Sequence, residues 1–192
     1  MARTKEFNPE EAVQAAVKVF WRQGYEKTSL DDLMQAMGIA RQSLYDTFGD
    51  KRKLYLKALA RYRDDTLAST RALFAGDGPV KEGFRKLLMS LSQESKVELR
   101  QGCLLLSANV EREADDEEIA ELLEENQKAV TEIFLEALER AQARGEIDKG
   151  KDPKALARFF VATVQGMRAM GRVQPKRKAL EAVAETALGV LG

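Results

Sequence analysis

Histidine is absent from this chain of 192 residues, and cysteine occurs once, at Cys103. Zinc sites and His-based catalytic triads depend on these side chains, so the sequence argues against both. A single thiol also excludes an internal disulfide, which fits a reducing compartment. No Gly-rich phosphate-binding loop occurs, and no nucleophile is paired with a base. The sequence therefore predicts no enzyme, no metal and no cofactor.

Long apolar runs are also lacking. Nowhere do about 18 apolar residues follow one another, and no signal-peptide pattern is present, so we expect a cytoplasmic protein without a membrane partner. With 4 Pro and 13 Gly, the chain leaves room for long helices, and its 44% hydrophobic residues are ordinary for a globular protein. No repeat or strand-like alternation is evident. The sequence predicts an all-α fold.

The most informative segment is residues 28–53, which predicts two short helices joined by a tight turn. Ser29 is placed to cap the first helix, and Asp32 completes a capping box with it. Gly38 follows the apolar stripe of this helix, where a helix end favours a residue that tolerates positive φ. A second helix is expected to start near Ala40. Two amphipathic helices across a glycine-containing turn are typical of the helix-turn-helix, whose second helix enters the DNA major groove.

The outward side chains of the second helix suit the reading of bases. Arg can donate two hydrogen bonds to guanine, Gln can bond both edge groups of adenine, and Ser can serve either base. Hydroxyl groups and cations on the same surface suit phosphate oxygens. We predict base contacts from Arg41, Gln42 and Ser43, phosphate contacts from Tyr45, Thr47 and Lys51, and further DNA contacts from Thr28 and Ser29.

A basic triplet, Lys51-Arg52-Lys53, follows the second helix. Asp50 is predicted to cap the next helix, which places these cations in its first turn, where each opposes the helix dipole at a cost of about 0.3–1 kcal/mol. A bound phosphate would reverse that sign, whereas the alternative is a solvated cluster. Arg3 and Lys5 could also reach DNA, although a frayed terminus is the simpler expectation. Residues 1–53 hold nine Lys/Arg and eight Asp/Glu, so we expect modest non-specific binding and reliance on base contacts.

At these residues the chain resembles the N-terminal domain of TetR/AcrR-type transcriptional regulators. The matching motifs are G-Y-x-x-T-S-L-D-D-L at Gly24–Leu33, M-G-I-A-R-Q-S-L-Y at Met37–Tyr45, and F-G-D-K at Phe48–Lys51. The resemblance implies a dimeric regulator, expected to be a repressor, that leaves a palindromic operator when a small apolar ligand binds. One departure is that Asp46 and Thr47 stand where the family often has an aromatic residue or His. Asp46 could instead accept a hydrogen bond from cytosine or select against other bases.

Further helices are predicted along the rest of the chain, with the clearest break at residues 75–79. We expect residues 1–50 to form the DNA-binding domain and residues 51–192 to form a helical ligand-binding and dimerisation domain. A helix starting at Asn8-Pro9 and ending at Gly24 should brace the helix-turn-helix. The later helices are expected at 54–74, 80–94, 100–112, 116–144, 153–172 and 176–191.

The last two helices are predicted to form the dimer interface. The helix at 153–172 is apolar on more than one face, so it must be buried on more than one side. The resemblance implies that both helices pair with their symmetry mates in a four-helix bundle, whereas the alternative is that they serve only the monomer core. The interface residues expected are Leu156, Phe159, Val164, Leu180, Val183, Ala187 and Leu191.

The resemblance also implies a small-molecule effector between the middle helices, although each candidate residue could be plain core. Cys103 has a second interpretation, because a thiol at a helix start near Arg100 can sense electrophiles or oxidants. With one Cys, such a switch needs an adduct, a sulfenic acid or an intersubunit bond. A helical interaction module that binds no DNA is the remaining alternative. The residues expected to line the ligand site are Phe84, Leu88, Leu91, Cys103, Leu105, Phe134, Leu138, Phe160 and Met167.

Overall fold

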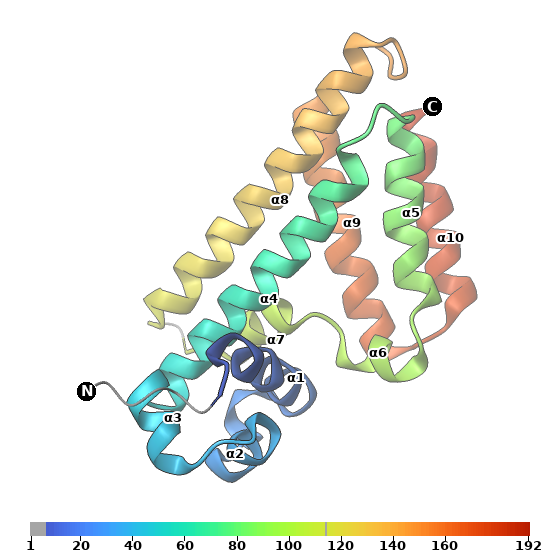
Figure 1. Ribbon diagram of the computed structural model, residues 1–192. Helices are drawn as coiled ribbons and strands as arrows, with labels where there is room; N and C mark the ends of the chain where they lie inside the picture. Colours follow the sequence, from blue (N-terminus) through green and yellow to red (C-terminus); the bar gives the residue numbers. More distant parts are fainter. Residues whose placement is uncertain (1–6, 114) are drawn as a thin grey trace. The chain divides into compact units, whose positions relative to one another are not determined.

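The structure is a computed structural model that describes residues 7–113 and 115–192. Arg3 and Lys5 therefore lie outside the described residues. Within these residues every regular element is helical, which confirms the predicted all-α class (Figure 1). The elements are α1 (Pro9–Lys27), α2 (Leu30–Met37), α3 (Arg41–Phe48), α4 (Lys51–Phe74), α5 (Val80–Gln93), α6 (Lys96–Gln101), α7 (Leu104–Glu111), α8 (Glu117–Ala143), α9 (Pro153–Val173), α10 (Arg177–Leu188) and the 3₁₀ turn η1 (Gly189–Leu191).

The chain divides into two compact units. The first comprises the described residues up to Asp65 together with Cys103–Leu122, and the second comprises Thr66–Gly102 together with Leu123–Gly192. The first unit therefore includes α7 in addition to the helix-turn-helix. Helices α4 and α8 each contribute residues to both units.

The first unit is built around α1, whose start follows the predicted signals. The Asn8 side chain accepts a hydrogen bond from the Glu10 backbone at 3.0 Å, and Pro9 occupies the first turn. At Gly24 the backbone leaves the helical region, with φ 77° and ψ 174°, before a last turn ends at Lys27. The predicted helix end at Gly24 therefore marks a break that only glycine accommodates easily.

The segment around Cys103 differs from the prediction. A single helix over 100–112 was expected, but α6 ends at Gln101 and α7 begins at Leu104. Between them, Gly102 adopts φ +67° and Cys103 is extended. The earlier helix is started by a capping box, in which the Ser95 side chain and the Glu98 side chain each accept from the other's backbone N–H. The expectation of one helix was wrong because Gly102, at positive φ, ends α6, while the capping box starts α6 upstream of residue 100.

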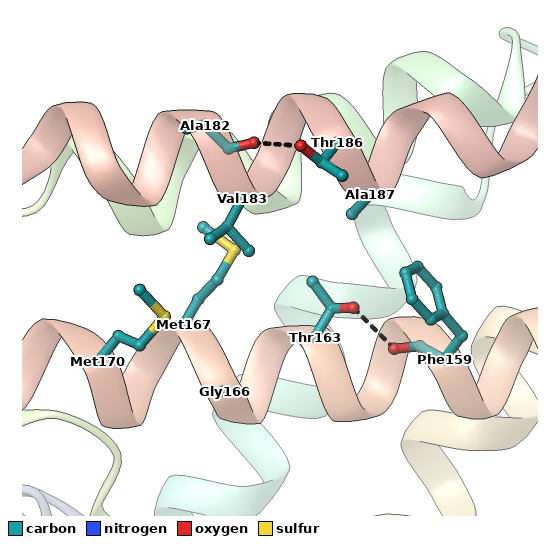
Figure 2. Close-up of a pocket in the computed structure, with 9 residues that line it drawn as sticks. All are labelled: Phe159, Thr163, Gly166, Met167, Met170, Ala182, Val183, Thr186 and Ala187. Atoms are coloured by element: carbon teal, nitrogen blue, oxygen red, sulfur yellow. Dashed lines mark hydrogen bonds between the residues drawn. The ribbon is translucent and has the colours of Figure 1, made fainter.

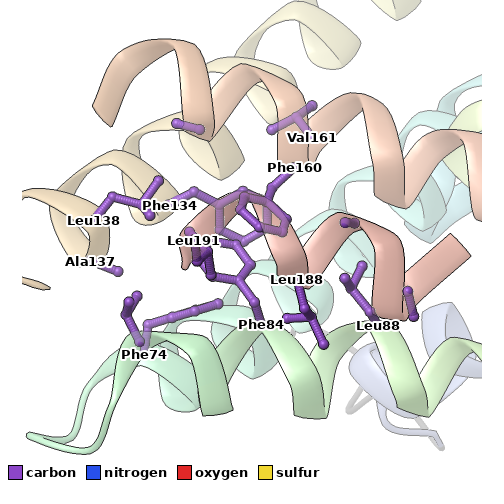
Figure 3. Packing of buried hydrophobic residues seen from close by; sticks show 14 of the residues in the cluster. Phe74, Phe84, Leu88, Phe134, Ala137, Leu138, Phe160, Val161, Leu188 and Leu191 are labelled. Atoms are coloured by element: carbon purple, nitrogen blue, oxygen red, sulfur yellow. The ribbon is translucent and has the colours of Figure 1, made fainter. Parts of the chain in front are cut away.

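The second unit has an aromatic core to which four helices contribute. Phe74, Phe84, Phe134 and Phe160 come from α4, α5, α8 and α9 and pack together (Figure 3). Helix α10 lies against α5 and closes the same core with Leu188. Burial of these large rings removes apolar surface from water and stabilises this unit.

Candidate nucleic-acid interface

The helix-turn-helix has the predicted local geometry. The Asp32 carboxylate accepts from the Ser29 backbone at 2.9 Å, and the Ser29 hydroxyl accepts from the Asp32 backbone at 3.1 Å. The Ser29 hydroxyl also donates to the Asp32 carboxylate at 2.6 Å, and this bond, together with the one from the Ser29 backbone, holds the pKa of Asp32 below its ordinary value. Gly38 ends α2 in the left-handed region, with φ 65° and ψ 32°. Leu44 and Phe48 are buried, so α3 presents its opposite side outward.

The outward side of α3 carries the residues predicted to meet DNA. Arg41 and Gln42 are exposed, Tyr45 is 43% exposed, and Ser43 and Thr47 are partly exposed. These side chains extend from one short rigid element, so their spacing is fixed by helical geometry. A single α-helix is an element that the major groove of B-DNA admits.

Two of these side chains already have weak partners within the protein. The Gln42 amide donates to an Asp46 carboxylate oxygen at 2.7 Å. The Arg41 guanidinium lies 3.6 Å from the Asp31 carboxylate, and both side chains are mostly exposed. Exposed ion pairs contribute about 0–1 kcal/mol, so a base or phosphate can replace such a partner at little cost. The hydrogen bond to Asp46 orients the Gln42 amide on the outward side of α3.

The two predicted DNA contacts before α2 are placed differently from each other. Thr28 is 2% exposed, and its hydroxyl donates to the Gly24 carbonyl oxygen at 2.6 Å. Its side chain is therefore part of the turn's interior and not of the surface. Ser29 is exposed, but its hydroxyl serves the capping box with Asp32.

The three cations of the basic triplet have different surroundings. The Asp50 carboxylate accepts from the Lys53 backbone at 2.7 Å, which confirms the predicted cap of α4. Lys53 is exposed, and the Lys51 ammonium lies 4.3 Å from the centre of the Tyr25 ring. Arg52 instead donates to both carboxylate oxygens of Asp116, a partner that neither the phosphate contact nor the solvated cluster considered for this triplet had included.

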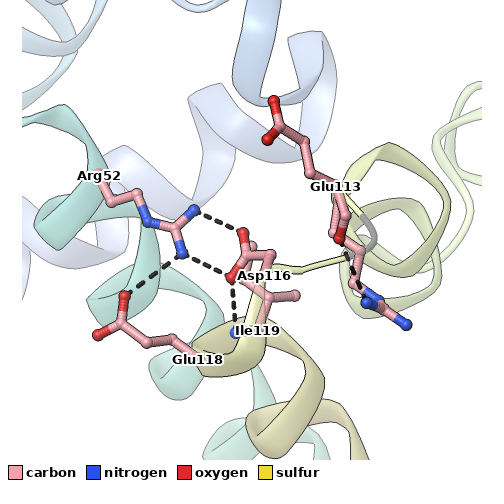
Figure 4. A network of polar contacts seen from close by, with 6 residues as sticks. Arg52, Glu113, Asp116, Glu118 and Ile119 are labelled. Carbon is pink, nitrogen blue, oxygen red and sulfur yellow. Dashed lines mark hydrogen bonds and ion pairs between the residues drawn. The ribbon is translucent and has the colours of Figure 1, made fainter.

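Arg52 and Asp116 form an ion pair with two hydrogen bonds within the first unit (Figure 4). The two hydrogen bonds measure 2.7 and 2.6 Å, and Glu118 adds a third oxygen at 3.4 Å. Hydrogen bonding to Arg52 lowers the pKa of Asp116, and the same bonds raise the pKa of Arg52. The sequence signal for this pair is the acidic run at 115–118, where a helix was predicted to start. The partner of Arg52 could not be inferred, because the two residues are 64 positions apart.

Two family profiles match this chain. Residues 12–58 match the bacterial regulatory proteins of the tetR family, and residues 85–187 match the tetracyclin repressor-like C-terminal domain. The chain belongs to the TetR family. It is a transcriptional regulator and not an enzyme.

Several relatives of this TetR-family regulator span its whole length. It is 33% identical over 193 residues to YezE of Bacillus subtilis, an uncharacterized HTH-type transcriptional regulator, covering 100% of both chains. It is 30% identical to the HTH-type transcriptional repressor ComR of Escherichia coli, covering 97% of this chain and 90% of ComR. A cysteine mutant of the TetR-family regulator CifR, solved with 26-base-pair double-stranded operator DNA, is 30% identical, covers 100% of both chains and superimposes with a TM-score of 0.85.

In this TetR-family regulator, α9 and α10 form an apolar groove of about 420 Å³. Phe159 and Met170 are 41% and 43% exposed on its wall. Among the predicted interface residues, Phe159, Val183 and Ala187 line the groove, and Leu156 and Val164 pack against the core. Leu180 and Leu191 are buried within the core of the second unit. The groove is lined by Phe159, Thr163, Gly166, Met167, Met170, Ala182, Val183, Thr186 and Ala187 (Figure 2).

The residues predicted to line a ligand site fall into two groups. Cys103 and Leu105 belong to the first compact unit, where Cys103 is a half-buried free thiol at the N-cap of α7 and Leu105 is buried. The other candidates are buried in the core of the second unit, where their side chains contact one another. These are Phe84, Leu88, Leu91, Phe134, Leu138, Phe160 and Met167. No helix of the described residues is long and apolar enough to cross a membrane.

Proposed function

We propose that this regulator is a dimeric repressor that binds a palindromic operator through α3 and releases it when a small apolar ligand binds. The observation that carries this proposal is the outward side of α3, where an arginine, a glutamine and a tyrosine are exposed on a helix whose other side is buried. The CifR relative was solved with operator DNA, which supports the same mode of binding.

Within α3 we assign the base contacts to Arg41, Gln42 and Ser43. Arg41 can exchange its exposed Asp31 partner for the hydrogen-bond acceptors of guanine. Gln42 keeps one amide N–H and its carbonyl oxygen for an adenine while its other N–H is bound to Asp46. Tyr45, Thr47 and Lys51 are assigned to phosphates, which fix the register of the helix on the duplex.

The groove between α9 and α10 supports a symmetric dimer. Its lining is apolar and contains exposed Phe159 and Met170, which solvent does not stabilise. A second copy of the chain would cover this surface with the same surface of its own, as in other two-fold interfaces. The dimer would then offer α3 twice, to half-sites separated by about one helical turn, roughly 34 Å. We propose residues 1–50 as the DNA-binding domain and residues 51–192 as the domain for ligand and dimer contacts.

The effector is proposed to be small and apolar, since the candidate residues of the second unit form an aromatic core. Such a ligand acts only if it binds one conformation of the dimer better than the other. The alternative trigger is Cys103, which is favoured by its partial exposure at the N-cap of α7. In that case, alkylation of the Cys103 thiol would release the DNA, and no apolar ligand would be needed.

The proposal is tested by selecting bound sequences from a random duplex pool and measuring binding to the selected duplex by fluorescence anisotropy. A palindromic consensus is expected. Arg41→Ala should cost about 1–3 kcal/mol and relax selectivity at one base position. Tyr45→Phe should weaken all duplexes alike, because phosphate contacts carry no sequence information.

The matched control is Lys128→Ala, which removes an exposed cation from α8 far along the chain from α3. It should leave operator binding unchanged. If binding survives both Arg41→Ala and Tyr45→Phe, the assignment of α3 as the reading helix is refuted.

A further inference from the structure

The bond between Arg52 and Asp116 ties together the first turns of two helices within the first compact unit. Arg52 lies in the first turn of α4, and Asp116 immediately precedes α8. Two parallel N–H···O bonds between a guanidinium and a carboxylate fix both the distance and the mutual orientation of the partners. The Asp116 side chain is 10% exposed and the Arg52 side chain is 36% exposed, so solvent screens this pair less than one in which both side chains are exposed.

Asp116 holds a second element with the same carboxylate. Its Oδ1 accepts from the Ile119 backbone at 3.1 Å, which caps the first turn of α8 (Figure 4). The orientation of this carboxylate is therefore set by α8 and is passed to Arg52. Arg52 in turn directly follows Lys51, the cation assigned to a DNA phosphate.

A second contact joins the end of α7 to the last turn of α1. Glu111, at the end of α7, accepts from the Tyr25 backbone at 3.2 Å. The approach is possible because Gly24 has no side chain: a Cβ there would lie 2.9 Å from a Glu111 carboxylate oxygen. The Tyr25 ring in turn lies under the Lys51 ammonium, at 4.3 Å.

We propose that Glu111, Asp116 and Glu118 form a latch that positions the DNA-contacting residues, and that Arg52 acts through this latch and not as a phosphate contact. The proposal rests on the proposed function, because it assigns a control route to the same DNA-binding surface. Helix α8 runs without interruption from Glu117 to Ala143. A change that shifts α8 therefore moves the Asp116 carboxylate, and the ion pair transmits that shift to the start of α4.

The competing interpretation makes the opposite prediction for Asp116→Asn. If Asp116 merely competed with DNA phosphates for Arg52, its neutralisation would free a cation and tighten operator binding. If the latch positions α4, the same substitution weakens binding. Asn retains an oxygen that can cap α8, so the substitution removes the charge while keeping the local helix start.

The experiment is a double-mutant cycle of Arg52→Gln and Asp116→Asn, measured as operator affinity over a range of salt concentrations. Each single variant should lose roughly 2- to 30-fold in affinity, the range seen for residues that modulate coupling. The double variant should be no weaker than either single variant, because both remove the same contact. The salt dependence should stay that of the wild type, because no phosphate contact has been lost.

Arg52→Lys separates the two roles further. Lysine keeps the positive charge but cannot form two parallel hydrogen bonds with a carboxylate. If Arg52 is a positioning residue, the operator affinity of Arg52→Lys should therefore be little higher than that of Arg52→Gln. Full restoration by lysine would overturn the proposal, as would a salt slope that falls by about one unit in Arg52→Gln. The matched control is Glu124→Gln, which breaks the exposed pair with Lys128 on the same helix and should change nothing.

Hydrogen exchange of α2 and α3 in the DNA-free protein tests the latch without relying on DNA binding. Faster exchange of α2 and α3 in Asp116→Asn, with unchanged exchange at the far end of α8, supports the latch. This result supports the latch even if no duplex is selected from the pool. In that case only the proposed function fails. Unchanged exchange and unchanged affinity in a wild type that does bind operator would overturn the latch alone. A lower melting temperature without either change would show a merely structural pair, and would also overturn it.

Discussion

The rings of Phe84 and Phe160 stack with their centroids 3.8 Å apart and an interplanar angle of 18°. Both side chains are fully buried, and Phe134 packs edge-on against Phe84 at 5.1 Å. The space where an apolar effector was expected is thus occupied by packed side chains. A ligand that binds among these residues must displace or reorient some of them, which links ligand binding to the shape of the core.

Replacement of Phe84 by alanine should destabilise the protein by about 3–5 kcal/mol, because the buried ring loses its apolar contacts and leaves a cavity. Denaturant unfolding at neutral pH measures this change. Val97→Ala is the matched control, since Val97 is 68% exposed and its truncation should stay within about 0.5 kcal/mol of the wild type. A loss below about 1 kcal/mol for Phe84→Ala would contradict a tightly packed core.

The sequence predicted those features that depend on residues close together in the chain. The capping box of Ser29 and Asp32, the Asp50 cap and the Asn8-Pro9 start of α1 all involve hydrogen bonds across two or three residues. Each bond satisfies a backbone amide that the helix itself leaves unpaired, so these helix starts can be predicted without knowledge of the tertiary structure. The outward side of α3 followed in the same way, from helical periodicity.

Features that depend on distant partners could not be predicted. The sequence context of Arg52 resembles that of Lys51 and Lys53, yet its partner lies 64 residues away. Thr28 has a hydroxyl suited to phosphate, but the turn at Gly24 buries it. Periodicity separates buried from exposed sides of a helix, whereas it cannot tell a core contact from a ligand contact, as Phe84 and Phe160 illustrate.

Gly24→Ala should destabilise the first unit by about 1–3 kcal/mol, because its φ of 77° with ψ of 174° is a conformation that nearly always requires glycine. The added Cβ would also lie 2.9 Å from Glu111, so Gly24→Ala combined with Glu111→Ala should recover part of the loss. Thermal unfolding of both variants measures this. Gly76→Ala is the control, since an added Cβ there meets nothing within 4 Å. Equal stability of the Gly24 and Gly76 variants would count against the strained turn.

The ion pair of Arg52 and Asp116 should stabilise the protein at neutral pH and lose that effect in acid. Arg52 holds the pKa of Asp116 below its ordinary 3.8, so the folded state releases this proton more readily than the unfolded chain does. The stabilisation is therefore present above the unfolded pKa and disappears as the pH falls through the lower folded pKa. Denaturant unfolding of wild type and Asp116→Asn from neutral pH to acid measures the difference. A gap that persists at the acid end would show that charge is not its cause.

Glu94 should respond to pH in the opposite sense. Its carboxylate accepts from Arg168 at 2.5 Å through one oxygen, while the other oxygen is buried without a partner among the described residues. Burial outweighs Arg168 and raises the pKa of Glu94, so the folded state favours the protonated carboxyl. The resulting stability is fully present below the unfolded pKa of about 4.5 and is lost as the pH rises through the higher folded pKa.

Arg168→Gln should enlarge this effect, because it removes the cation that opposes the burial of the carboxylate. We expect a loss of about 1–3 kcal/mol at neutral pH, from a buried acceptor left poorly paired, and a smaller loss near pH 4.5, where Glu94 is increasingly protonated. Denaturant unfolding at both pH values measures it. Glu94→Gln in the same background removes the titrating group, so the double variant should lose the extra pH dependence. If it keeps that dependence, another group is responsible.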